Sequence, residues 1–202
     1  MVITIERQYG SGGRLVGEKL AKLLGYEFYD RELLKIAARE SGMSEDVVEH
    51  FDERPTNSLF LSSYLLSSYM MSDAIPLNQK LAFAQFDVIR KVAQSGDCVI
   101  VGRCADYVLQ ARSDRLSVFI HASNDVRAQR LVKYYGVPEA FVEKVIKRED
   151  RSRSEYYTSF TQSKWSDLRH YDLVVDTGIF GLDNAAGLIA EAVRLKQGTK
   201  SP

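Results

Sequence analysis

The chain has 202 residues, 45% of them hydrophobic and 27% charged, and its formal net charge at pH 7 is zero. This length suits one well-buried domain, and we expect residues 1–202 to form a single domain. A balanced charge gives no overall field that would attract nucleic acid or an anionic membrane, so we predict neither partner. No export leader and no apolar run of about 18 residues stands out, which favours a cytoplasmic protein.

The first predicted element is an apolar strand that runs directly into a glycine-rich loop. Residues 3–14 read ITIERQYGSGGR, and a helix follows. Glycines allow backbone N–H groups to turn toward an anion, and a helix N-terminus adds the positive end of its dipole. We therefore predict a phosphate-binding loop formed by Gly10, Ser11, Gly12 and Gly13. The loop departs from the Walker A pattern G-x-x-x-x-G-K-[ST], because Gly13 and Arg14 stand where the lysine and the residue after it would fall.

Short apolar runs alternate with amphipathic helical patterns along the chain. The first helix is predicted over Arg14–Leu24, with its leucines on one side and its charges on the other. Such alternation predicts a three-layer α/β domain with a five-stranded parallel sheet. The predicted strands are Val2–Ile5, Glu27–Tyr29, Val99–Val101, Leu116–Ile120 and Leu173–Val175.

One long interval, residues 31–95, interrupts the alternation because its patterns are helical throughout. We predict helices over 31–40, 45–51 and 77–93, which together form a helical insertion that covers a substrate. Within the insertion, Leu59–Met71 is apolar and rich in serine. Since this run is too short to span a bilayer, we interpret it as a core or dimer-contact helix and expect a homodimer.

Charged residues follow three of the predicted strands directly, at the sheet edge where α/β proteins bind ligands. Asp30 and Arg31 follow the second strand, and they either bind substrate or cap and pair at the next helix. Arg103 follows the third strand and has the same two interpretations. Arg127 lies in the first turns of the helix after the fourth strand. We predict that these residues bind the substrate and, for Arg127, also the nucleotide.

A second basic concentration runs from Arg127 and Arg130 to Arg153, over a predicted helix, a break at Gly136-Val137-Pro138 and another helix. The region 136–165, which contains Arg148, Arg151 and Arg153, is predicted to be a lid. Several guanidinium groups around one point suit a polyphosphate whose charge shifts during transfer. The alternative is a solvated helix face whose arginines pair with neighbouring carboxylates. The aromatic residues that follow, Tyr156 to Trp165, are predicted to pack the lid onto the domain.

Taken together, these segments resemble the cytidylate kinase-like family of P-loop kinases over most of the chain. The resemblance implies a phosphoryl transferase that uses ATP and Mg²⁺ and acts on a nucleoside monophosphate or another small acceptor. It implies that Arg103 and Arg127 hold the acceptor phosphate, and that Arg151 and Arg153, with Arg148 beside them, act on the transferred phosphate. The family's cytosine-reading aspartate is Ser152 here, so the resemblance does not support CMP specificity.

Because the loop lacks the Walker A lysine, another residue must supply the positive charge that binds the phosphates. We expect the longer side chain of Arg14 to curl back onto the phosphates, and the hydroxyl of Ser11 to serve as a metal ligand. A second interpretation is a nucleotide-binding regulatory or assembly module that has lost turnover. A third is a dinucleotide-binding oxidoreductase, since Asp30 lies about 20 residues beyond the loop, but the third glycine of G-x-G-x-x-G is absent.

Overall fold

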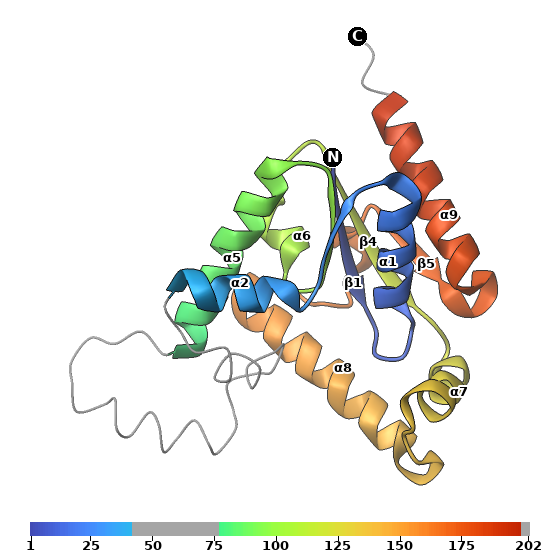
Figure 1. Ribbon diagram of the computed structural model, residues 1–202. Coiled ribbons are helices and arrows are strands. Elements are labelled where there is room, and N and C mark those ends of the chain that lie inside the picture. Colours follow the sequence, from blue (N-terminus) through green and yellow to red (C-terminus); the bar gives the residue numbers. More distant parts are fainter. Residues whose placement is uncertain (42–76, 199–202) are drawn as a thin grey trace, which may run out of the picture.

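The computed structural model describes residues 1–41 and 77–198 (Figure 1). Within these ranges, five strands form one parallel sheet in the order β2-β3-β1-β4-β5, as the buried apolar runs predict. The strand that leads into the glycine-rich loop is the central one, so it is hydrogen-bonded on both sides. The strands are β1 (Val2–Arg7), β2 (Glu27–Tyr29), β3 (Cys98–Val101), β4 (Arg115–His121) and β5 (Leu173–Asp176).

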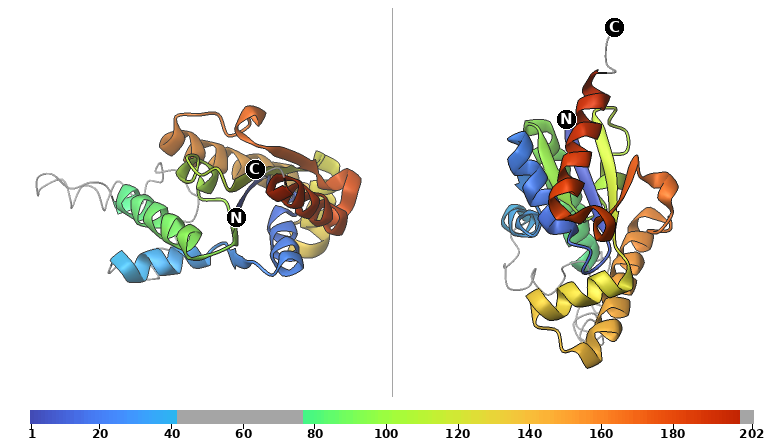
Figure 2. Two further views of the ribbon diagram at one scale, coloured as in Figure 1. Left: turned by 90° about the horizontal axis from the view of Figure 1, so that it is seen from above. Right: turned by 90° about the vertical axis from the view of Figure 1, so that its right-hand side faces the viewer.

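Helices lie on both faces of the sheet, which gives the predicted three layers (Figures 1 and 2). One face carries α1 and α9, and the other carries α5, α6 and the aromatic end of α8. The helices are α1 (Gly13–Leu24), α2 (Glu32–Ser41), α5 (Leu77–Ser95), α6 (Ala105–Val108), α7 (Asn124–Tyr135), α8 (Glu139–Thr161) and α9 (Thr177–Gly198), with a short 3₁₀ helix at Leu168–His170.

The central strand shows how side-chain alternation builds the two cores. Ile3 and Ile5 pack with the cluster under α1 and α9, whereas Val2 packs with the cluster that includes α5 and Trp165. Because successive side chains of a strand point to opposite faces, a strand that is apolar on both faces is buried between two helical layers. Three polar residues of this strand are buried as well: Thr4, Glu6 and Arg7.

Helix α8 extends past the carboxyl ends of the strands (Figure 1). The predicted break before it is confirmed, since α7 ends at Gly136 in the left-handed conformation and α8 begins after Pro138. The buried Tyr156, Tyr157 and Trp165 join the core, which confirms that these aromatic residues pack the helix onto the domain.

The predicted helical insertion is described only at its two ends, where α2 and α5 are helical as expected. The predicted helix 45–51 and the apolar run Leu59–Met71 lie outside the described residues. Among the residues that are described, no helix is long and apolar enough to cross a membrane.

Candidate functional site

The glycine-rich loop is a tight turn between the end of β1 and the start of α1. Gly10 and Gly12 have φ values of 76° and 80°, a region that favours glycine. The backbone amide of Ser11 donates to the carbonyl oxygen of Gln8 over 3.3 Å, and that of Gln8 donates to the carbonyl of Ile120 over 3.0 Å. The N-cap of α1 is Gly12, which has no side chain to cap the first amides of the helix. Amides at a helix start are where a phosphate-binding loop holds its anion.

Ser11 is fully buried, and its hydroxyl donates to the carbonyl of Gln8 over 2.8 Å. The side chain thus points into the loop's own backbone rather than toward the start of α1. The suggestion that Ser11 is a metal ligand stays a prediction, and this geometry does not favour it.

The loop is held from outside by Arg130 of α7 and Thr177 of α9. The carbonyl oxygen of Ser11 accepts from Arg130 Nη1 over 2.7 Å and from Thr177 Oγ1 over 2.6 Å. Arg130 also donates to Thr177 Oγ1 over 2.8 Å, and burial lowers the pKa of its guanidinium. Sequence reasoning grouped Arg130 with the basic run and gave it no role at the loop. Its position one turn after Arg127 was the signal that could have identified it.

Arg127 joins the loop to α8. Its Nη1 donates to Asp150 Oδ2 over 2.5 Å and to the carbonyl of Tyr9 over 3.1 Å, and only 5% of its side chain is exposed. Asp150 also accepts from the backbone amide of Tyr9 over 2.7 Å. In this conformation the guanidinium expected to hold a phosphate is therefore paired with a carboxylate of the predicted lid.

The three lid arginines point in different directions. Arg153 faces the loop: its Nη1 donates to the carbonyl of Arg7 over 2.9 Å, and its guanidinium lies 5.4 Å from the ring centroid of Tyr9. Arg148 and Arg151 point outward and pair with acidic neighbours on α8, Glu149 and Glu155. The alternative of a solvated helix face thus describes Arg148 and Arg151 in this conformation, while Arg153 belongs to the loop.

Arg14 lies along the outside of α1 rather than over the loop. Its Nε donates to Asp30 Oδ2 over 2.9 Å and its Nη1 to Glu18 Oε2 over 3.2 Å, with 55% of the side chain exposed. Asp30 therefore binds Arg14 through its side chain, and Arg31 is exposed. The structure brings Arg14 and Asp30 together, but in this conformation neither contacts the loop through the described interactions.

Arg103 is buried at the end of β3, in an unusual turn. Gly102, Arg103 and Cys104 have φ values of 75°, 62° and 55° in succession. The left-handed conformation costs about 1–2 kcal/mol at a residue with a side chain, and such strain is concentrated at functional sites. The amide of Gly102 donates to the carbonyl of Ile5 over 2.9 Å, which fixes this turn beside the central strand.

Two buried carboxyl groups lie near the same turn, and sequence reasoning missed both. Glu6 Oε2 accepts from Trp165 Nε1 over 3.0 Å, and Asp106 Oδ2 accepts from the Tyr157 hydroxyl over 2.7 Å. Burial raises the pKa of Asp106. The signal for Glu6 was its position directly after the predicted strand Val2–Ile5. These residues give the sheet side of α8 a polar lining at the ends of β1 and β3.

The described residues fit a phosphate group better than they fit a metal. The loop offers backbone amides in a glycine turn, whereas no group of three or more His, Cys, Asp or Glu among residues 1–41 and 77–198 could hold a metal ion. The position after the missing lysine, which supplies a hydroxyl ligand in Walker A loops, is Arg14. Direct ligation of Mg²⁺ by this loop therefore lacks its usual ligand.

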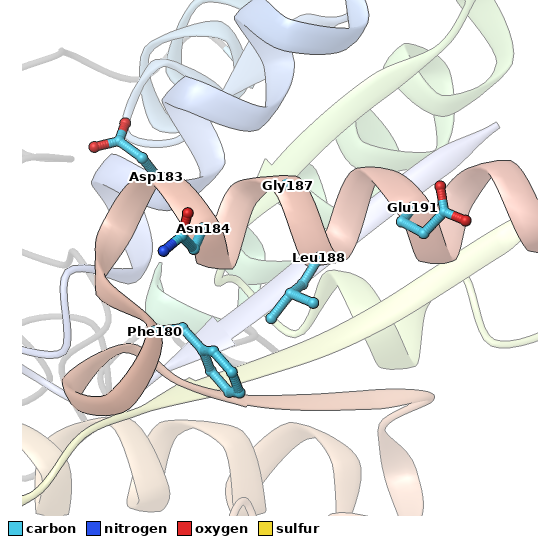
Figure 3. A pocket seen from close by; sticks show the side chains of 6 residues that line it. All are labelled: Phe180, Asp183, Asn184, Gly187, Leu188 and Glu191. Carbon is cyan, nitrogen blue, oxygen red and sulfur yellow. The ribbon is translucent and has the colours of Figure 1, made fainter.

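A shallow surface hollow lies on α9, on the side opposite the residues that pack against the sheet (Figure 3). Its lining is Phe180, Asp183, Asn184, Gly187, Leu188 and Glu191. None of the predicted site residues lines it.

Comparison with known proteins places this geometry among kinases. The model of the cytidylate kinase-like family matches residues 2–179. The cytidylate kinases of Methanopyrus kandleri and Methanothrix thermoacetophila are 25% and 26% identical to this chain, with 96% of the chain covered in each case and 93% and 98% of the relative.

Solved structures share this fold. An uncharacterized protein from Eubacterium ventriosum has a TM-score of 0.73 and 28% identity, covering 96% of this chain and 98% of that one. The shikimate kinase from Bacteroides thetaiotaomicron has a TM-score of 0.56 at 14% identity, with 96% and 98% coverage. At that identity, the likeness to shikimate kinase shows a shared fold.

Proposed function

Because the chain belongs to the cytidylate kinase-like family, we propose that it transfers the γ-phosphate of ATP to a nucleoside monophosphate or another small acceptor. The observation that carries the proposal is the contact of Arg153 in α8 with the carbonyl of Arg7 and the ring of Tyr9. This contact brings a cation of the lid to the loop that has the geometry of a phosphate cradle. Phosphoryl transfer needs mainly positioning and neutralisation of charge, and these two elements supply both.

The roles of the residues follow from where they lie. The amides at the start of α1 bind phosphate oxygens, and Arg153 neutralises charge on the exposed side of the phosphates. The buried Arg103, Glu6 and Asp106 lie on the other side of the central strand end, where an acceptor would approach. Mg²⁺, when bound, would help to neutralise the charge of the phosphates, but this loop lacks the hydroxyl group that usually holds it.

The acceptor is the less defined half of the reaction. In this chain Ser152 stands where the family reads cytosine. Glu155 stands where the resemblance implies an acceptor-binding arginine, and it is paired with Arg151 on the outside of α8. Neither residue supports cytidine recognition. We assign the acceptor only to the class of small phosphorylated or hydroxylated molecules, with nucleoside monophosphates first, and place the enzyme in the cytoplasm, where ATP and these acceptors occur.

A second candidate function is a nucleotide-binding regulatory module without turnover. Three observations favour it: Gly13 replaces the lysine, Arg127 is paired with Asp150, and Arg14 is paired with Asp30. A loop that binds nucleotide without promoting transfer would tolerate all three. The presence of Arg153 at the loop favours the enzyme instead.

One experiment separates the two functions. The protein is incubated with γ-labelled ATP and a panel of nucleoside monophosphates, nucleosides and small hydroxy acids, and labelled products are separated by chromatography. Transfer to one acceptor well above the rate of ATP hydrolysis supports the kinase. Saturable ATP binding without transfer to any acceptor supports the module, and absence of ATP binding contradicts both.

A further inference from the structure

Gly13 lies against the side chain of Arg7. A Cβ atom built on Gly13 would lie 2.5 Å from Cβ of Arg7 and 2.9 Å from its Cγ. Both distances are well below those of real Cβ contacts, so any side chain at position 13 would require Arg7 to move. The atoms in conflict are the first carbons of Arg7, which the strand backbone holds in place. Arg7 therefore fills the space that a side chain at position 13 would occupy.

The same two positions are the ones at which this loop departs from the Walker A pattern. In G-x-x-x-x-G-K, a glycine stands six positions before the lysine. Here the second glycine of the pattern is Gly12, so the first falls at Arg7 and the lysine at Gly13. The usual loop has glycine and then lysine at this pair, and this chain has arginine and then glycine. Relative to that pattern, this chain has its cationic residue at the strand end and its glycine at the helix start.

We infer that Arg7 is the triphosphate-binding cation of this loop and replaces the missing lysine. The inference rests on the proposed function, because it assigns a residue to the same phosphate site. Arg7 is the last residue of the central strand, and its side chain begins beside Gly13, the first residue of α1. A side chain that starts there can carry its guanidinium to the amides that bind phosphate, where the planar fork can donate two bonds to one phosphate group.

The surroundings of Arg7 hold its side chain at this place. Only 9% of the side chain is exposed, and its Nη1 lies 3.9 Å from Oε2 of the buried Glu6. That glutamate oxygen also accepts from Trp165 Nε1 over 3.0 Å, which fixes the carboxylate. A distance of 3.9 Å is an ion pair rather than a hydrogen bond, so Glu6 orients the guanidinium.

Arg14 is the competing source of the charge. Its side chain is 55% exposed and bound by Asp30 and Glu18 on the outside of α1, so it would have to leave two carboxylates to reach a phosphate. Arg7 is paired with the buried Glu6, and its first carbons already occupy the position of the missing side chain.

The first test measures binding of ATP, and of inorganic tripolyphosphate, by isothermal titration calorimetry. Arg7→Met keeps the apolar stem and removes the charge, and we expect a roughly 10- to 100-fold loss of affinity for both ligands, which corresponds to one lost charge-assisted contact. Arg7→Lys should recover part of the affinity, and Arg14→Met should lose less than Arg7→Met. Unchanged affinity in Arg7→Met, or a larger loss in Arg14→Met, would overturn the inference.

The second test exchanges the two positions. Gly13→Lys alone should weaken binding and lower the melting temperature because of the clash with Arg7, and Arg7→Gly alone should weaken binding by loss of charge. The double variant Arg7→Gly with Gly13→Lys recreates the usual pattern, and we expect it to bind triphosphate at least tenfold more tightly than either single variant. A double variant that binds triphosphate no more tightly than the weaker-binding single variant would contradict the inference that the two positions act as a pair.

These tests separate this inference from the proposed function. If the wild type and the Arg7→Met variant bind ATP equally tightly, the role of Arg7 is contradicted and the proposed kinase function is unaffected. Wild-type protein that does not bind ATP contradicts both. The close contact between Arg7 and position 13 can be tested without any ligand. Gly13→Ala should destabilise the wild type more than it destabilises the Arg7→Gly variant, and equal effects would contradict this contact.

Discussion

Arg127 of α7 and Asp150 of α8 form an ion pair of 2.5 Å between Nη1 and Oδ2. They are 23 residues apart in the chain, and Asp150 also accepts from the amide of Tyr9 in the glycine-rich loop. One carboxylate thus connects the helix after β4, the predicted lid and the loop. Buried charges of this kind stabilise a structure only while both partners are present.

Asp150→Ala should therefore be strongly destabilising. It removes the partner of a guanidinium that is only 5% exposed, and we expect the free energy of unfolding to fall by about 3 kcal/mol. Urea denaturation followed by circular dichroism measures this change. The matched control is Glu149→Ala, which breaks the exposed pair with Arg148 and should cost less than about 1 kcal/mol. Equal effects of the two variants would show that the pair at Asp150 contributes no more than a surface pair.

Arg153→Ala should weaken both the contact of α8 with the loop and the binding of ATP. The variant loses the hydrogen bond to the carbonyl of Arg7 and the stacking on Tyr9, together worth about 1–2 kcal/mol of stability. We expect ATP affinity to fall about tenfold or more, measured by titration calorimetry. Lys147→Ala, an exposed residue of the same helix, is the control. An affinity loss shared equally by both variants would indicate a general effect of charge rather than a contact.

Gly12→Ala should disturb the loop in two ways. The residue has a φ of +80°, and an added Cβ would lie 2.5 Å from Cδ2 of Leu182. We expect a loss of about 1–2 kcal/mol, most of it from the left-handed backbone, because Cδ2 is the end of the Leu182 side chain and can shift. Gly25→Ala isolates the backbone cost, because its φ is +69° and no atom lies within 4 Å of its added Cβ. A Leu182→Ala change should relieve part of the Gly12→Ala defect, and melting temperatures report the result.

Asp106 predicts a dependence of stability on pH. Burial raises the pKa of this carboxyl in the folded protein, so the folded state keeps the proton to a higher pH than the unfolded chain does. Stability is therefore lost as the pH rises from the ordinary carboxyl pKa, about 4, through the raised value. The variant Asp106→Asn does not lose stability in this way. Compared with the wild type, the variant should therefore be more stable at pH 7 than it is at pH 4.

Tyr157→Phe tests the pKa of Asp106 by removing its hydrogen-bond donor. The tyrosine hydroxyl donates to Asp106 Oδ2 over 2.7 Å and favours the charged carboxylate. Without that donor, the pKa of Asp106 should rise further and the loss of stability should extend to higher pH. Urea denaturation at several pH values tests both variants. If the free energy of unfolding of Asp106→Asn differed from that of the wild type by the same amount at every pH, the raised pKa of Asp106 would be contradicted.

The architecture could be predicted from sequence because its signals are local. Strands such as Val99–Val101 are short apolar runs, and the helix break at Gly136-Val137-Pro138 is set by backbone preferences of those residues alone. The strand ends differ by one or two residues: β1 extends to Arg7, beyond the predicted Ile5, because Glu6 and Arg7 pair with β4 although they are charged. Pairing between distant strands overrides the apolar pattern there.

The site could be predicted less completely because its contacts join distant segments. The loop was recognisable from its glycines, but the pairing of Arg127 with Asp150 depends on how α7 and α8 cross. The different directions of Arg151 and Arg153 depend on the rotation of α8 about its axis. Arg7 was not identified because an arginine at a strand end is unremarkable until Gly13 is seen against it.

Helix α8 is one uninterrupted helix of 23 residues, with the loop contacts of Asp150 and Arg153 followed immediately by the buried Tyr156 and Tyr157. A continuous helix of this length is a stiff rod of about 35 Å. One of these tyrosines, Tyr157, donates to Asp106. The contacts to the loop and the hydrogen bond to the polar lining at the ends of β1 and β3 are therefore made by one continuous helix.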